Sequence, residues 1–324
     1  MLRIRTIIVA CCLLIPLSLL FALLTGSVEI SISDLVHWLT EPAPTGTSAL
    51  ILDLRLPRAL SALIVGALLA SAGTLMQVLL RNPLADPYIM GISGGAAVTT
   101  LLAMLFGVSG IWLSGSAFAG ALLSISLVFV VGHGQGSWTP TRLLLTGVIL
   151  AFGWAAMISF ILAISPNAQL QSMLYWLMGD LSASTSPLVG AIVLLLAVFI
   201  CVPRLRSLNV LMLGDDQATT LGIDVKKERL LIFLIASLMT AVAVTMAGSI
   251  GFVGLVVPHM LRLLGGNDHR YLFPASLLFG SSLLLIADTL ARSLLAPQQL
   301  PVGVLTAMLG VPLFLYLLYR DRQL

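Results

Sequence analysis

The chain has 324 residues, of which 59% are hydrophobic and only 9% are charged, and its mean hydropathy is +1.10. A typical soluble domain contains about 25% charged residues, because it keeps a polar surface in contact with water. The composition therefore excludes a soluble enzyme, a secreted disulfide scaffold and a nucleic-acid-binding protein, and it predicts an integral membrane protein. The formal net charge of +3 indicates no polyanionic partner.

Motifs that carry enzyme chemistry are missing from the sequence. The lysines, Lys226 and Lys227, are adjacent and follow Val225, so the sequence contains no GxxxxGK[ST] loop to cradle nucleotide phosphates. The three cysteines lie in apolar runs, which is typical of small buried hydrophobes. His259 ends the apolar stretch 256–259, where a packed structural role is favoured over metal binding. We therefore expect no catalytic residue, no metal site and no cofactor bound by this chain.

Apolar segments long enough to cross a membrane dominate the chain, and their length predicts helices because barrel strands alternate over only about 10 residues. A span needs about 20 mostly apolar residues. A shorter run, 250–264, can cross if a tight turn joins it to its neighbour or if the bilayer is locally thin. The first segment is interpreted as a retained helix rather than a signal peptide, since no clean cleavage site follows it. About ten spans are predicted, at 6–25, 59–80, 88–107, 112–132, 142–164, 187–203, 229–249, 250–264, 272–295 and 300–319.

The basic residues predict the orientation of these spans. Ten spans place both termini on one side, and basic residues are enriched in cytoplasmic loops. With cytoplasmic termini, Arg55, Arg58 and Arg292 face outward. The remaining thirteen face inward: Arg3, Arg5, Arg81, Arg142, Arg204, Arg206, Lys226, Lys227, Arg229, Arg262, Arg270, Arg320 and Arg322. The sequence therefore predicts cytoplasmic termini and a single transmembrane domain over 1–324.

The longest inward loop, 204–228, has a sequence typical of a short capped helix near 213–223. Asp215 or Asp216 can cap its start, and Gly222 can end it in a left-handed conformation. A soluble subunit could dock on such a helix, but an ordered surface loop explains the pattern equally well. A second inward connection, 81–87, contains two prolines, which restrict its backbone. It suits a gate hinge or an ordinary helix hairpin.

The polar residues on the outward side allow two interpretations. Arg55, Arg58 and Arg292 could receive carboxylates of an external protein. Alternatively, the arginines snorkel to the interface, or Arg292 pairs with Asp288 one turn away. Asp288 lies well inside a span, and an acid in that position is a functional hypothesis by default. It keeps open the alternative of an ion-coupled secondary transporter, although such a carrier normally needs more than one acid.

Several stretches in one order resemble the FecCD-type permeases, which are membrane subunits of binding-protein-dependent ABC importers for iron–siderophores, haem and cobalamin. The resemblance covers about 50–319. It is carried by Arg55–Arg58, Gln77–Pro87, Gly91–Ala96, Leu213–Gly222, Gly248–His259, Asp268–Arg270, Ala287–Arg292 and Leu300–Gly303.

The resemblance implies a type II importer permease in the bacterial inner membrane. It implies a homodimer with ten helices per chain, two subunits that bind and hydrolyse ATP with Mg²⁺, and a periplasmic or lipid-anchored substrate-binding protein. In the family, positions matching Arg55, Arg58 and Arg292 receive glutamates of the binding protein. The loop 213–223 matches the coupling helix that fits the ATPase, which assigns this contact to Gly214, Asp215, Asp216, Ala218, Leu221 and Gly222.

Cobalamin permeases, which the resemblance includes, have cytoplasmic gates at positions matching Asn82, Leu84 and Thr141. Pro140 stands where the family often has a small polar residue, which makes the second gate a weaker match. The resemblance also implies that 165–187 helps to line the cavity. An iron chelate, siderophore or haem, is the first expectation for the substrate and cobalamin the second. A sensor or scaffold without transport fits this ordered set of motifs poorly.

Overall fold

A computed structural model describes residues 2–26, 28, 30–40, 50–133, 139–182 and 186–320. These residues form helices and no strand, which confirms the all-α prediction for the described part of the chain. The helices are α1 (Leu2–Leu24), α2 (Ile32–Thr40), α4 (Leu56–Leu80), α5 (Ile92–Leu105), α6 (Ile111–His133), α7 (Pro140–Ile164), α8 (Asn167–Met178), α9 (Leu188–Cys201), α10 (Leu205–Leu211), α11 (Asp215–Thr220), α12 (Val225–Ala247), α13 (Val253–Gly265), α14 (His269–Ser293) and α15 (Val302–Arg320). Three short segments complete the set: the π-helical turn η1 (Leu50–Arg55) and the 3₁₀ turns η2 (Pro87–Met90) and η3 (Val202–Arg204).

Seven described segments are long and apolar enough to cross a membrane, so the chain is a multi-pass membrane protein. They are Arg5–Leu24, Leu50–Leu80, Ile111–Gly132, Pro140–Ile164, Leu188–Leu211, Val225–Ala247 and His269–Ser293. The other three predicted spans contain the shorter apolar helices Ile92–Leu105, Val253–Gly265 and Val302–Leu317. The span expected over 88–107 is divided, because Gly91 adopts a left-handed φ of 69° between η2 and α5. Ten crossings therefore stay a prediction.

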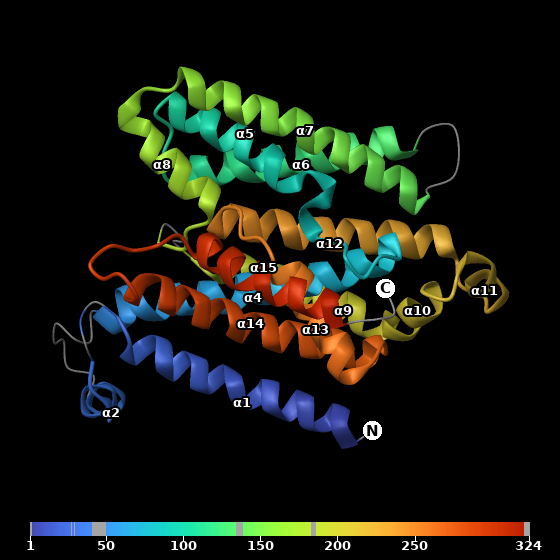
Figure 1. The fold of residues 1–324 in the computed structure, drawn as a ribbon, viewed down its shortest axis with the longest axis horizontal. Coiled ribbons are helices and arrows are strands. Elements are labelled where there is room, and N and C mark those ends of the chain that lie inside the picture. The colour runs from blue at the N-terminus through green and yellow to red at the C-terminus, as the bar shows by residue number, and fades with distance from the viewer. Residues whose placement is uncertain are drawn as a thin grey trace.

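Helix α4 forms the centre of the bundle, where it packs against α12, α13 and α14 (Figure 1). Every residue from Val65 to Leu80 is buried. Small residues make this packing possible, because they let helix backbones approach closely within a membrane. A methyl group at Gly73 would overlap the backbone carbonyl of Gly254 in α13. The backbones of α4 and α13 are therefore in close contact at Gly73.

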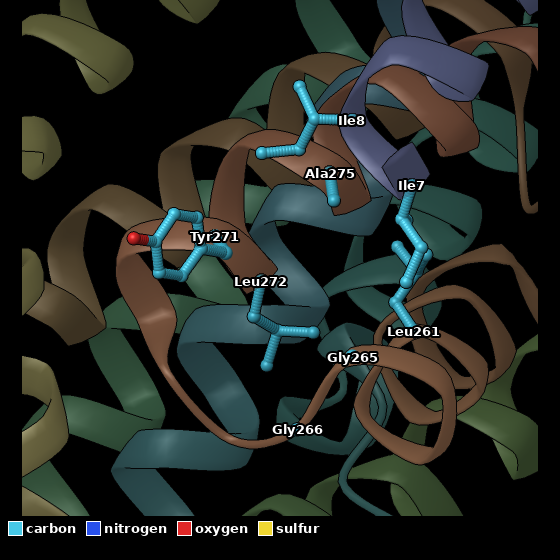
Figure 2. A pocket seen from close by; sticks show the side chains of 8 residues that line it. All are labelled: Ile7, Ile8, Leu261, Gly265, Gly266, Tyr271, Leu272 and Ala275. Carbon is cyan, nitrogen blue, oxygen red and sulfur yellow. The ribbon is translucent and has the colours of Figure 1, made fainter. Parts of the chain in front are cut away.

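Helix α1 lies along α14 at the edge of the bundle (Figure 1). Figure 2 shows Ile7 and Ile8 of α1 near Leu261 of α13 and near Leu272 and Ala275 of α14. The space between them has a volume of about 10 Å³. A single water needs at least about 10–15 Å³, so this crevice is a packing seam and not a ligand site.

The two ends of the bundle differ in what they carry (Figure 1). At one end, which we call the α11 end, α1 begins, α15 ends, and α10 and α11 extend from the helices. The opposite end carries α2, the start of α4 and the end of α14. The chain thus begins its first helix and ends its last described helix at the same end. Which end faces the cytoplasm stays a prediction.

Candidate functional site

Three arginines expected on one face converge in a single hollow at the end of the bundle opposite α11. Arg55 ends η1, Arg58 lies in the first turn of α4, and Arg292 lies in the last turn of α14. The hollow has a volume of about 310 Å³. Its polar lining consists of Asp53, Arg55, Arg58, Ser182, Arg292 and Gln299. We call it the arginine hollow.

Arg58 is held in place by a buried carboxylate. Its Nη2 lies 2.8 Å from Oδ1 of Asp288 and its Nε lies 2.9 Å from Oδ2, which is a bidentate ion pair. Nη1 donates to Oε1 of Gln299 at 2.9 Å. The Asp288 side chain is 2% exposed and that of Arg58 is 15% exposed. The described partner of Asp288 is therefore Arg58, and the alternative pairing with Arg292 is not formed.

The other two arginines bind the end of α1. Arg55 donates to the backbone carbonyls of Leu23 and Val28, and Arg292 donates to the carbonyl of Ala22. The last carbonyls of a helix lack partners within the helix and carry partial negative charge. Arg55 is 4% exposed, so most of its guanidinium is enclosed by these contacts.

Cationic side chains make the arginine hollow suited to an anionic group. Three guanidiniums surround it. Its acidic neighbours are Asp53 in the lining, Asp180, which acts on Arg58, and Asp288, whose carboxylate is occupied by Arg58. The buried Nε of Arg292 has no hydrogen-bond partner among the described residues. A carboxylate brought by another protein would find cationic donors here. The role of Arg55, Arg58 and Arg292 in docking stays a prediction.

The expected short helix in the 204–228 loop is α11, but its start differs from the prediction. Gly214, with a φ of 128°, occupies the N-cap position, and neither aspartate caps the helix. Asp215 instead accepts hydrogen bonds from Arg81 and Arg229, the latter at 2.7 Å. The carboxylate turns away from the helix start because two guanidiniums offer stronger, charge-assisted partners.

The end of α11 follows the prediction. Gly222 has a φ of 81°, and the Ile223 amide donates to the carbonyl of Ala218 at 3.0 Å. Ala218 is fully buried within the chain, whereas Leu221 is 64% exposed. Ala218 therefore packs α11 against the bundle. The side chains that are exposed and available to a partner are Asp216, Gln217 and Leu221. The role of 213–223 in ATPase coupling stays a prediction.

The predicted gate residues lie close to α11. Arg81 caps α4 in a left-handed conformation with a φ of 49°, and Asn82 follows it. The Asn82 side chain accepts the amide of Leu84 at 2.9 Å, which stiffens the turn, and Leu84 is 36% exposed. Thr141 is exposed in the first turn of α7. Arg81 thus joins the loop 82–87 directly to α11.

A second hollow, of about 460 Å³, lies between α11 and the starts of α7 and α12. Its polar lining includes Thr139, Asp215, Thr219, Asp224 and Arg229. Thr139 caps α7 by accepting the amide of Arg142. The segment expected to contact an ATPase therefore borders both segments expected to form gates.

Burial affects one further group in the loop 82–87. Desolvation raises the pKa of Asp86 to about 6, and the hydrogen bond from the Tyr88 amide at 2.7 Å opposes that shift. The described residues contain no group of three or more His, Cys, Asp or Glu side chains that could hold a metal ion.

The sequence prediction missed Arg81 and Arg229 as partners of Asp215. Arg81 lies 134 residues away in the chain, so no local spacing indicates the contact. Arg229 lies 14 residues away, across the turn between α11 and α12. The only available signal was the run of basic residues around the loop.

Comparison with known proteins identifies the family. The sequence profile of the FecCD transport family matches residues 13–320. The chain is 41% identical over 283 residues to the hemin transport system permease protein HmuU of Yersinia pestis, covering 84% of each chain. It is 39% identical over 316 residues to the vitamin B12 import system permease protein BtuC of Shigella boydii, covering 96% of this chain and 94% of that protein.

A solved structure described as an inward-facing conformation of a metal-chelate type ABC transporter has the same fold. The two superpose with a TM-score of 0.87 at 33% sequence identity, covering 98% of this chain and 99% of the other. The resemblance that was expected from the motifs is thereby confirmed over nearly the whole length. This chain belongs to the FecCD transport family and is a permease of that family.

Proposed function

We propose that the chain is the permease subunit of an ATP-driven, binding-protein-dependent importer in the bacterial inner membrane. Its substrate is an iron chelate, siderophore or haem, or cobalamin, which crosses by alternating access. Relatives named for hemin and vitamin B12 transport and a structural neighbour named for a metal chelate support this substrate class. ATP and Mg²⁺ bind to partner subunits, consistent with the absence of a P-loop motif.

One observation supports the proposal: the arginine hollow lies at one end of the bundle and the exposed helix α11 lies at the other (Figure 1). The arginine hollow suits carboxylates of an external, periplasmic or lipid-anchored binding protein. The opposite end presents α11, whose Leu221 and Asp216 are exposed while Ala218 holds the helix on the bundle. A permease that links a binding protein on one side to two ATP-binding subunits on the other needs both surfaces.

The working unit in this proposal is a homodimer. Helix α7 is largely exposed, and its exposed positions include small residues that would let a second helix approach closely: Ala151, Gly153, Ala155, Ala156 and Ser159. A cavity between two copies would then open toward the α11 end when the loop 82–87 and the start of α7 move apart from their partners in the second copy, and would close when they return.

The ion pair of Asp288 argues against the ion-coupled alternative. A coupling acid must exchange its proton or ion during the cycle. Asp288 is instead held by two nitrogens of Arg58, at 2.8 Å and 2.9 Å, and its side chain is 2% exposed. Its described geometry is that of a structural pair between α4 and α14.

The test is ligand uptake into proteoliposomes that contain this chain, its ATPase and its binding protein. Haemin, a ferric hydroxamate siderophore and cyanocobalamin are offered separately, with internal ATP or a non-hydrolysable analogue. If one ligand accumulates with internal ATP but not with the non-hydrolysable analogue, the proposal is supported and the substrate is named. Accumulation without ATP or partner proteins overturns it and favours the ion-coupled alternative.

A further inference from the structure

A single carboxylate links the first turn of α11 to two other helices. Arg81, which caps α4, and Arg229, in the first turns of α12, both donate to Oδ1 of Asp215, the latter at 2.7 Å. The Arg229 side chain is 9% exposed and that of Asp215 is 43% exposed. Arg229 is thus a fixed point within the bundle, while Asp215 lies on the surface helix.

The rest of α11 is loosely connected to the bundle. Glycines with positive φ stand on both sides of it, Gly214 at 128° and Gly222 at 81°, and such positions permit a wide range of backbone angles. Ala218 is its buried contact, whereas Asp216, Gln217, Thr219 and Thr220 are exposed. A displacement of α11 would therefore be passed to its neighbours mainly at Asp215 and Ala218.

The loop that receives this displacement is stiff. Arg81 is followed at once by Asn82, whose side chain accepts the amide of Leu84 at 2.9 Å. Prolines at 83 and 87 restrict the backbone on either side. A force on the Arg81 guanidinium would therefore move the loop 82–87 as a unit rather than be absorbed by bending.

We propose that Asp215 is a positioning residue that transmits movement of α11 to the loop 82–87 through Arg81. The inference rests on the proposed function, in which a partner ATPase moves α11. Asp215 also keeps two like charges together, because without it the guanidiniums of Arg81 and Arg229 face each other without a shared counter-ion. Its removal separates the loop from α11 and leaves the helix itself in place through Ala218.

The test follows the loop itself and needs no knowledge of the substrate. Leu84, which is 36% exposed, is replaced by cysteine in the full complex with the ATPase. Its reaction with a charged, membrane-impermeant maleimide is timed in inside-out vesicles with and without ATP. The native cysteines, Cys11, Cys12 and Cys201, lie in apolar helices and provide the background. ATP hydrolysis and uptake are measured on the same preparations.

We expect ATP to change the labelling rate at position 84 several-fold in the Leu84→Cys complex. Asp215→Asn should reduce this change to less than twofold while ATP hydrolysis continues, and Asp215→Glu should restore part of it. Arg81→Gln should have the same effect as Asp215→Asn, and the double variant should be no worse than either. The matched control is Asp224→Asn, which removes a carboxylate from the same loop and keeps a side chain able to cap α12.

The outcomes separate this inference from the proposed function. A full ATP-dependent change in Asp215→Asn, or no ATP-dependent change at position 84 in a complex that imports ligand, overturns the inference alone. A complex that neither hydrolyses ATP nor imports any of haemin, ferric siderophore or cyanocobalamin overturns the proposed function. Loss of the labelling change in Asp224→Asn as well would show a general charge effect and would also overturn the inference.

Discussion

Replacing Asp288 by alanine should strongly destabilise the bundle. The change removes one partner of an ion pair whose side chains are 2% and 15% exposed, and it leaves the Arg58 guanidinium without its carboxylate. Breaking a buried pair in this way typically costs about 3–5 kcal/mol. We expect the lower end, about 3 kcal/mol, because Arg58 keeps its bond to Gln299 and borders the arginine hollow.

The double variant Arg58→Ala/Asp288→Ala gives the sharper test. Once both charges are gone, no buried charge is left unpaired, so the double variant should be less destabilised than the sum of the two single variants. Equilibrium unfolding in mixed micelles measures each free energy, and about 3 kcal/mol corresponds to a change of roughly 100-fold in the unfolding constant. Asp53→Ala is the control, because Asp53 lines the same hollow and takes part in none of the described ion pairs. Additive single effects, or an Asp288→Ala variant as stable as Asp53→Ala, would refute the reasoning.

Three further predictions test other parts of the structure. Gln299→Glu places a carboxylate beside Arg58, and this carboxylate should compete with the binding protein for the guanidinium. We expect the affinity for the binding protein to fall several-fold in surface-based binding assays. Unchanged affinity would contradict docking at the arginine hollow. Gly73→Ala should lower the stability by about 1–3 kcal/mol, because the added methyl group meets the Gly254 carbonyl. The control Gly115→Ala places its methyl group in open space and should be neutral. Equal thermal stability of the two variants would contradict the packing. Asp86→Asn should match the wild type in stability near pH 4 and exceed it above about pH 6, because burial penalises only the ionised carboxylate. Parallel stability curves of the two proteins from pH 4 to 7 would contradict the raised pKa of Asp86.

The membrane class and the helical elements could be predicted from the sequence because they depend on local composition. An apolar run of about 20 residues in lipid must form a helix, because a helix satisfies its backbone hydrogen bonds within the segment, wherever the neighbouring helices lie. The motifs likewise indicated the FecCD family before any contact was known. The left-handed Gly222 and the short helix α11 also follow from local residue preferences, as the structure confirms.

The tertiary structure decided which polar side chains meet. Asp288 has an arginine one turn away in its own helix, yet it pairs with Arg58, which is 230 residues distant. The sequence predicts that Asp215 or Asp216 caps α11, yet Gly214 occupies the N-cap position and two guanidiniums from α4 and α12 bind the carboxylate of Asp215. Spacing along the chain describes only neighbours on one helix, whereas these partners are set by how α4 packs against α12 and α14. Charged groups in a mostly apolar bundle bind the strongest partner that this packing brings within reach, because an unpaired buried charge is costly.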